Sequence, residues 1–150
     1  IAFPHLEACL LDSLKKRVNF LEETIALLKL ENITAIHGRA EEFAKNKAYR
    51  EQYDLCVSRA VSNLATLSEY CLPYVKVGGN FISYKSGTVQ EELQQAEKAV
   101  KILGGKIQDV VYFNLPDSEI QRSLVVIEKM KPTPGRYPRK AGTPLKEPLS

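Results

Sequence analysis

Charged residues follow short apolar runs at three points of the sequence. Asp12 ends a run that begins at Leu6, Glu41 comes a short turn after Ile33 to Ile36, and Arg59 comes just after Leu55 to Val57. A carboxylate in such a place can accept hydrogen bonds from the hydroxyl pair of a ribose or from an amino group. The five-donor guanidinium of arginine suits a carboxylate, a phosphate or a guanine edge. The pattern indicates a site that holds its ligand by polar contacts.

Each of these positions also has a purely structural interpretation. Asp12 can simply stabilise the positive N-terminus of a following helix, and Gly38-Arg39-Ala40-Glu41 can be a plain turn into a helix. Arg59 can form an internal ion pair. Lys85 repeats the position of Arg59 one unit later and can be a solvated lysine, just as Lys15-Lys16-Arg17 can be a solvated helix face.

Motifs for covalent or metal catalysis do not occur in the sequence. There is no G-x-S-x-G, no P-loop and no H-E-x-x-H, and the three cysteines, Cys9, Cys56 and Cys71, include no C-x-x-C pair. We expect reduced core cysteines, no metal, and no functional role for His5 or His37. A transferase that acts only by positioning its substrates needs none of these motifs.

The apolar pattern predicts alternating strands and helices that position the charged residues. Strands are predicted at 6–11, 33–36, 54–57 and 80–84, and helices at 14–28, 40–47, 62–70 and 88–103. Ser13 is a predicted N-cap, and Thr88-x-x-Glu91 matches a capping box. Such alternation is typical of a mostly parallel α/β sheet, whose strands end at one shared edge. We therefore expect Asp12, Glu41 and Arg59 to converge at that edge.

The C-terminal part departs from this alternation. Residues 106–115 and 123–129 are predicted strands with too short a connection for a crossover helix, so they should pair as an antiparallel hairpin. Residues 129–150 carry six basic side chains and one acid, a net +5, whereas the other 128 residues carry 15 basic and 17 acidic side chains. We therefore divide the chain into a domain, residues 1–131, and a basic Pro-rich tail, residues 132–150. The tail either attracts nucleic-acid phosphates or is a disordered linker.

The composition is that of an ordinary soluble globular protein, and we expect a cytoplasmic location. Apolar residues make up 44% and charged residues 26%, and no apolar run approaches the roughly 20 residues of a membrane span. The chain begins at Ile1, with no leader sequence and no glycine-rich turn after an opening strand. We interpret it as part of a longer protein.

Several motifs, taken in order, resemble one family. They are Leu10 to Arg17, His37 to Glu41, Val57 to Ala60, Tyr84-Lys85 and Tyr137 to Pro144. The chain resembles the bacterial small-subunit ribosomal RNA guanine-N7 methyltransferases, also called glucose-inhibited division protein B. The resemblance covers nearly all 150 residues, and the family's glycine-rich first motif lies outside them.

The resemblance implies a Rossmann-like class I methyltransferase that uses S-adenosylmethionine to methylate guanine N7 of small-subunit (16S) ribosomal RNA. It implies that the family's first strand lies between the strands ending at Asp12 and Ser58, so this chain alone has a gap in its sheet and is inactive. The implied roles are cofactor binding for Asp12, Ser13, Ala40, Glu41 and Arg59, with Arg59 also catalytic, and RNA binding for Lys16, Arg17, Lys85, Arg136, Arg139 and Lys140. The alternatives are a non-catalytic RNA-binding or ribosome-associated module and, third, a nicotinamide-dependent oxidoreductase.

Overall fold

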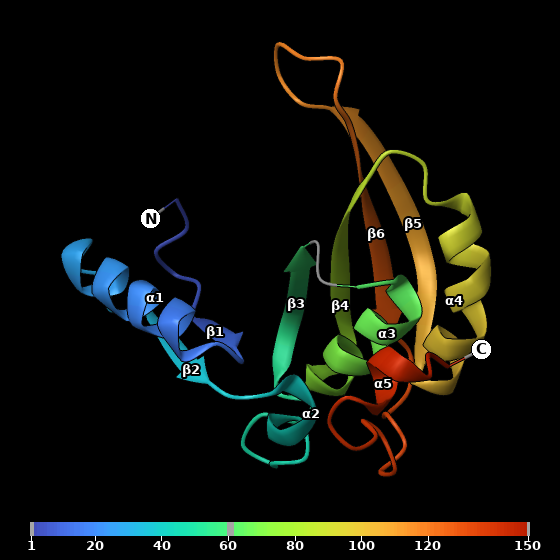
Figure 1. Cartoon of the computed structure of the whole chain (residues 1–150), viewed down its shortest axis with the longest axis horizontal. Coiled ribbons are helices and arrows are strands. Elements are labelled where there is room, and N and C mark those ends of the chain that lie inside the picture. The colour runs from blue at the N-terminus through green and yellow to red at the C-terminus, as the bar shows by residue number, and fades with distance from the viewer. Residues whose placement is uncertain (1, 60–61, 150) are drawn as a thin grey trace.

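The computed structural model describes residues 2–59 and 62–149, shown in Figure 1. The elements follow in the order β1 (Ala8–Asp12), α1 (Lys15–Leu27), β2 (Ile33–His37), α2 (Ala40–Phe43), β3 (Tyr53–Arg59), α3 (Leu64–Cys71), the 3-10 helix η1 (Leu72–Tyr74), β4 (Val75–Ser86), α4 (Gln90–Ile102), β5 (Gly105–Asn114), β6 (Gln121–Lys129) and α5 (Thr143–Lys146). The predicted alternation of strands and helices is confirmed.

The strands form two sheets. β1 and β2 pair in parallel, and a second sheet has the order β3-β4-β6-β5. In the second sheet β3 and β4 are parallel, whereas β6 pairs antiparallel with both β4 and β5, which confirms the predicted hairpin. Within the described residues, β1 and β3 belong to different sheets and are not paired (Figure 1). The predicted break in the sheet therefore lies where the resemblance put it.

The second sheet carries the main core. Helix α3 contacts β4, and α4 contacts both α3 and β5. Apolar side chains of α3, η1, α4 and the central strands are fully buried together, including Leu64, Leu72, Phe81, Val100 and Ile127. Burial of side chains of this size contributes about 1.5–3 kcal/mol each, so these contacts hold α3 and α4 firmly on the sheet.

Helix α1 buries fewer of its apolar side chains than the sequence pattern, an apolar stripe over residues 14–28, predicted. Val18 is fully buried, but Leu14 and Leu28, at the ends of the stripe, are about half exposed. The contacts of α1 with neighbouring elements are chiefly to β2 and β1. A two-stranded sheet offers little surface, which explains why only the middle of the stripe is covered.

Three local predictions about helix ends were wrong. Leu14, not Ser13, is the N-cap of α1, because Asp12 Oδ1 accepts the Leu14 N–H at 2.8 Å. The capping box at Thr88 makes no side-chain cap bond, and Val89 is the N-cap of α4. Helix α2 ends at Phe43, not near residue 47, because Asn46 Oδ1 accepts the Ala48 N–H and favours a turn.

The Pro-rich tail packs against the domain. Arg50 donates to the carbonyl oxygens of Thr133 at 2.7 Å and Tyr137 at 2.9 Å, and Thr66 Oγ1 donates to Pro144 O at 2.9 Å. Thr133, Tyr137 and Pro144 are buried. The disordered-linker alternative is therefore wrong. No helix in the two described ranges has the length and apolarity needed to cross a bilayer.

Candidate functional site

Asp12 lies at the carboxyl end of β1, as predicted. Its Oδ1 accepts the Leu14 N–H at 2.8 Å and its Oδ2 accepts Arg17 Nη1 at 3.3 Å. Its carbonyl oxygen accepts the Gly38 N–H at 3.0 Å, and a ring nitrogen of His37 lies 3.1 Å from Ser13 O. The ends of β1 and β2 are thus held side by side. The carboxylate makes the structural contact at the start of α1 and stays partly exposed, with acceptor capacity left.

Glu41 lies on α2, which follows the carboxyl end of β2. The residue is only 6% exposed, and its Oε1 accepts a hydrogen bond from the Gly142 N–H at 2.9 Å. The preceding residue, Ala40, accepts the Tyr74 hydroxyl at 2.7 Å, and Tyr74 directly precedes β4. Because β3 and β4 are parallel, this contact fixes α2 at their amino ends, opposite the arrowhead of β3 in Figure 1.

The predicted convergence of Asp12, Glu41 and Arg59 is therefore wrong for Glu41 with Arg59, because the two residues lie at opposite ends of β3. Arg59 is the last residue of β3 and pairs with Tyr84, so it lies at the carboxyl end of the strand whose amino end faces α2. Two physical reasons account for this. The buried carboxylate of Glu41 accepts a hydrogen bond from the tail, and among the described residues no strand joins the β1-β2 sheet to β3.

Arg59 and Lys85 have different surroundings. The Arg59 side chain is exposed and makes no hydrogen bond within the described residues. The Lys85 side chain is only 12% exposed, and its Nζ donates to Ser62 O and Glu92 Oε1, each at 2.7 Å. The solvated-lysine interpretation of Lys85 is therefore wrong, and little of its ammonium is left for a phosphate.

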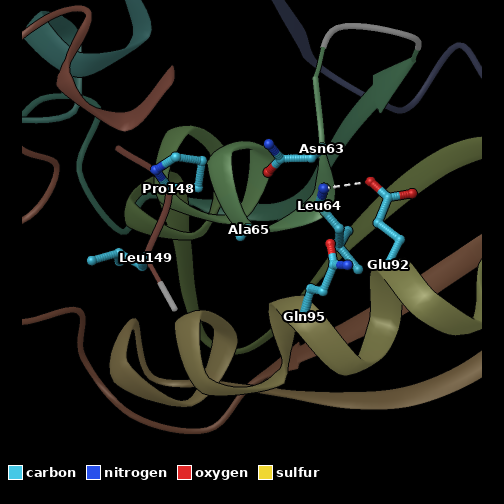
Figure 2. Close-up of a pocket in the computed structure, with 7 residues that line it drawn as sticks. All are labelled: Asn63, Leu64, Ala65, Glu92, Gln95, Pro148 and Leu149. Atoms are coloured by element: carbon cyan, nitrogen blue, oxygen red, sulfur yellow. Dashed lines mark hydrogen bonds between the residues drawn. The ribbon is translucent and has the colours of Figure 1, made fainter. Parts of the chain in front are cut away.

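Glu92 is a residue that the sequence interpretation missed. Its Oε1 also accepts the N–H of Leu64, the first residue of α3 (Figure 2). It borders a cavity of about 250 Å³, whose lining residues are Asn63, Leu64, Ala65, Glu92, Gln95, Pro148 and Leu149. The contact joins residues 28 positions apart, so no local pattern signals it. By contrast, the sequence alone could have identified Asn63 as a helix N-cap, because asparagine is preferred at that position. Its Oδ1 accepts a hydrogen bond from the Thr66 N–H at 2.9 Å.

The basic residues predicted to bind RNA fall into two groups. Lys16, Arg17, Arg136 and Lys140 are exposed. Arg139 instead forms a bidentate ion pair with Glu69, with Nη2 to Oε2 at 2.7 Å and Nε to Oε1 at 3.0 Å, and the Glu69 side chain is fully buried. Glu69 raises the pKa of Arg139 above its usual value. Arg139 is thus an anchor of the tail.

The residues with the most strongly shifted pKa values lie at the amino end of β3 and β4. Burial raises the pKa of Tyr53 to about 12 and raises the pKa of Tyr74 further, and their rings meet edge to face at 6.2 Å. A hydrogen bond between the Cys71 and Cys56 side chains raises the pKa of the Cys71 thiol, and burial raises it further. These groups stay protonated near neutral pH, so they serve packing and not acid-base chemistry. The described residues contain no cluster suited to a metal ion.

Solved structures define the class to which this fold belongs. An rRNA methylase from Streptococcus thermophilus matches with a TM-score of 0.58 at 16% identity, over 83% of this chain and 74% of that one. TYW2 from M. jannaschii, crystallised in complex with AdoMet, matches with a TM-score of 0.59 at 14% identity, over 83% and 58% of the two chains. The fold is that of the class I methyltransferases, as the sequence resemblance implied.

The sequence comparison then gives the family. Residues 1–125 match the GidB family, described as rRNA small subunit methyltransferase G. Ribosomal RNA small subunit methyltransferase G of Lachnoclostridium phytofermentans is 56% identical over 149 residues, which are 99% of this chain and 62% of that protein. The chain belongs to the rRNA small subunit methyltransferase G family, and it spans about three fifths of the length of this relative.

Proposed function

We propose that these residues, within a protein of the length of their relatives, transfer a methyl group from S-adenosylmethionine to guanine N7 of small-subunit (16S) ribosomal RNA. The observation that carries this proposal is the family match over residues 1–125, together with 56% identity to a named member. Because the proposed substrate is ribosomal RNA, we expect the reaction to take place in the cytoplasm.

The side chains present fit the cofactor only in part. Asp12 fits the ribose hydroxyls, because its carboxylate lies at a strand end, is partly exposed and keeps acceptor capacity. Ser13 follows it and is exposed. Ala40 and Glu41 do not fit the adenine as they stand, because Tyr74 and Gly142 hold them at the opposite end of β3 from Arg59. Contacts of Ala40 and Glu41 with the cofactor require α2 to be repositioned.

The proposed methyl transfer requires no acid or base from the protein. When bound, S-adenosylmethionine supplies an activated methyl group, and guanine N7 has a lone pair and no proton, so no general base is needed. The protein's task is to hold the reacting atoms in line. Arg59, exposed at the end of β3, would orient guanine through O6 or a phosphate while leaving N7 unbound.

The exposed basic residues would supply attraction to RNA. Arg136 and Lys140 carry this role in the tail, and Lys16 and Arg17 carry it on α1. The internal bonds of Lys85 and Arg139 make those two residues weak candidates for a phosphate contact. Replacing Arg136 and Lys140 with alanine should weaken RNA association more at low salt than at high salt. An equal loss at both salt concentrations would refute this electrostatic role.

The 150 residues by themselves should be inactive. β1 and β3 are not paired with each other, and Leu55 and Val57 of β3 are about half exposed. An unpaired strand edge leaves backbone hydrogen-bonding groups without partners. A cofactor site between these strands needs further residues to close the sheet.

A non-catalytic RNA-binding module is the alternative, and the internal use of Glu41 is the observation in its favour. Mass mapping of 16S ribosomal RNA from cells that lack the protein separates the two functions. The proposal expects one guanine to lose its N7 methyl group. Wild-type protein should restore it, and the Arg59→Ala variant should not. Unchanged RNA in the deletion strain would refute the enzymatic function, and rescue by Arg59→Ala would refute the role of Arg59 alone.

A further inference from the structure

The carboxyl end of β4 contacts the chain on both sides of the segment that follows β3. Tyr84 pairs with Arg59, the last residue of β3. The next residue, Lys85, donates from Nζ to Ser62 O at 2.7 Å. Two consecutive residues of one strand therefore hold the chain before and after the connection from β3 to α3.

Glu92 completes this arrangement from the first turn of α4. One oxygen, Oε1, accepts both Lys85 Nζ at 2.7 Å and the Leu64 N–H, as Figure 2 shows for Leu64. The Leu64 amide is one of the N–H groups that a helix start leaves without an internal partner. A carboxylate also suits that end of the helix dipole. Glu92 thus fixes the start of α3, while Lys85 fixes the residue just before Asn63.

We propose that Lys85 and Glu92 form a positioning pair for Arg59, holding the chain at Ser62 and Leu64 so that the guanidinium faces the substrate. The inference rests on the function proposed above, in which Arg59 orients guanine. The exposed Arg59 side chain makes no hydrogen bond in the described ranges. The direction of its guanidinium therefore depends on the position of the Arg59 backbone. Backbone pairing with Tyr84 secures one side, and the lysine and glutamate secure the other.

The partly buried setting makes this pair stronger than an ordinary surface ion pair. Lys85 is 12% exposed and Glu92 is 27% exposed, so water screens their attraction less than it screens an exposed pair. Each partner also makes a second bond, to Ser62 O or to the Leu64 amide. Removing either partner leaves the other with an unmatched charge, so each single substitution should disturb the same segment.

The test uses a protein of the relatives' length, with S-adenosylmethionine and small ribosomal subunits from the deletion strain as substrates. Glu92→Ala and Lys85→Met should each lower kcat about tenfold, since misplacement of an orienting group affects the chemical step. The KM for S-adenosylmethionine should change by less than about threefold. The double variant should be no worse than the more impaired single variant. Lys85→Arg should recover most of the activity.

The matched control is Glu91→Ala, which removes a carboxylate from the same helical turn, where the Glu91 side chain is exposed. Hydrogen exchange gives a readout without activity, because the Leu64 amide should exchange faster in Glu92→Ala than in Glu91→Ala. Equal exchange, or an unchanged kcat in the Lys85 and Glu92 variants of an active enzyme, would refute the positioning pair alone. An inactive wild-type enzyme would refute the proposed function and the pair together.

Discussion

The two sheets of this protein differ sharply in how much they bury. Among residues 2–50, Val18 and Ala44 are the buried apolar side chains, whereas all the others in the described structure lie between residues 64 and 144. Phe20 on α1 is 66% exposed, and Phe81 on β4 is completely buried. The comparison shows that an apolar pattern predicts an element, whereas the neighbouring elements determine how much of it is buried.

The proposed site spans both regions. Asp12 belongs to the sparsely packed one, and Arg59 belongs to the sheet that carries the core. Polar contacts join the regions at the amino end of β3, through Tyr74 with Ala40, and through Glu41 with Gly142. The region around Asp12, which should bind the ribose of the cofactor, is therefore the region with the fewest buried apolar side chains.

The largest expected effect compares one phenylalanine from each region. Phe81→Ala should lower the free energy of unfolding by about 3–5 kcal/mol, because it empties a fully buried position. Phe20→Ala should change it by less than about 0.5 kcal/mol. Urea denaturation of both variants measures the difference. Similar losses would show that α1 is packed as well as the main core.

The anchor of the tail should give the next largest effect. Arg139→Ala leaves the buried Glu69 carboxylate without its partner and should cost roughly 2–3 kcal/mol of unfolding free energy. The adjacent Lys140→Ala is the matched control, because Lys140 is exposed. Its effect should be near zero in the same denaturation experiment. If the two variants were equally stable, the tail would not be anchored by this ion pair.

A smaller effect tests the junction between the regions. Tyr74→Phe removes only the hydroxyl that donates to Ala40 O, and it should cost about 1 kcal/mol. The loss should be accompanied by faster amide exchange in α2 and not in α4. If the amides of α2 exchanged at the same rate in Tyr74→Phe as in the wild type, other contacts would hold α2 at the amino end of β3.

The smallest effect is a pH dependence at the same junction. Burial raises the pKa of Tyr53 to about 12, from 10.0 in the unfolded chain. The unfolded chain therefore loses the phenol proton first, and stability falls as pH rises from 10.0 toward 12. Tyr53→Phe should make the fall in stability shallower over this range. An identical slope in the variant, measured by urea denaturation at each pH, would contradict the contribution of Tyr53.

Sequence reasoning predicted those parts of the site that depend on neighbouring residues. Asp12 and Arg59 follow apolar runs, and both lie at strand ends as expected. The burial of Glu41 was not predictable, because its partner Gly142 lies 101 residues away. The same holds for Arg139 and Glu69, which are 70 residues apart. Charge composition alone could not separate exposed basic residues in the tail from one that anchors it.

Isothermal titration of S-adenosylmethionine tests the central claim most directly, namely that Asp12 belongs to a cofactor site completed only in a protein of the relatives' length. That protein should bind the cofactor, its Asp12→Ala variant should bind at least about tenfold more weakly, and the 150-residue chain should not bind. Absence of binding to the longer protein, or unchanged affinity in the Asp12→Ala variant, would contradict the claim.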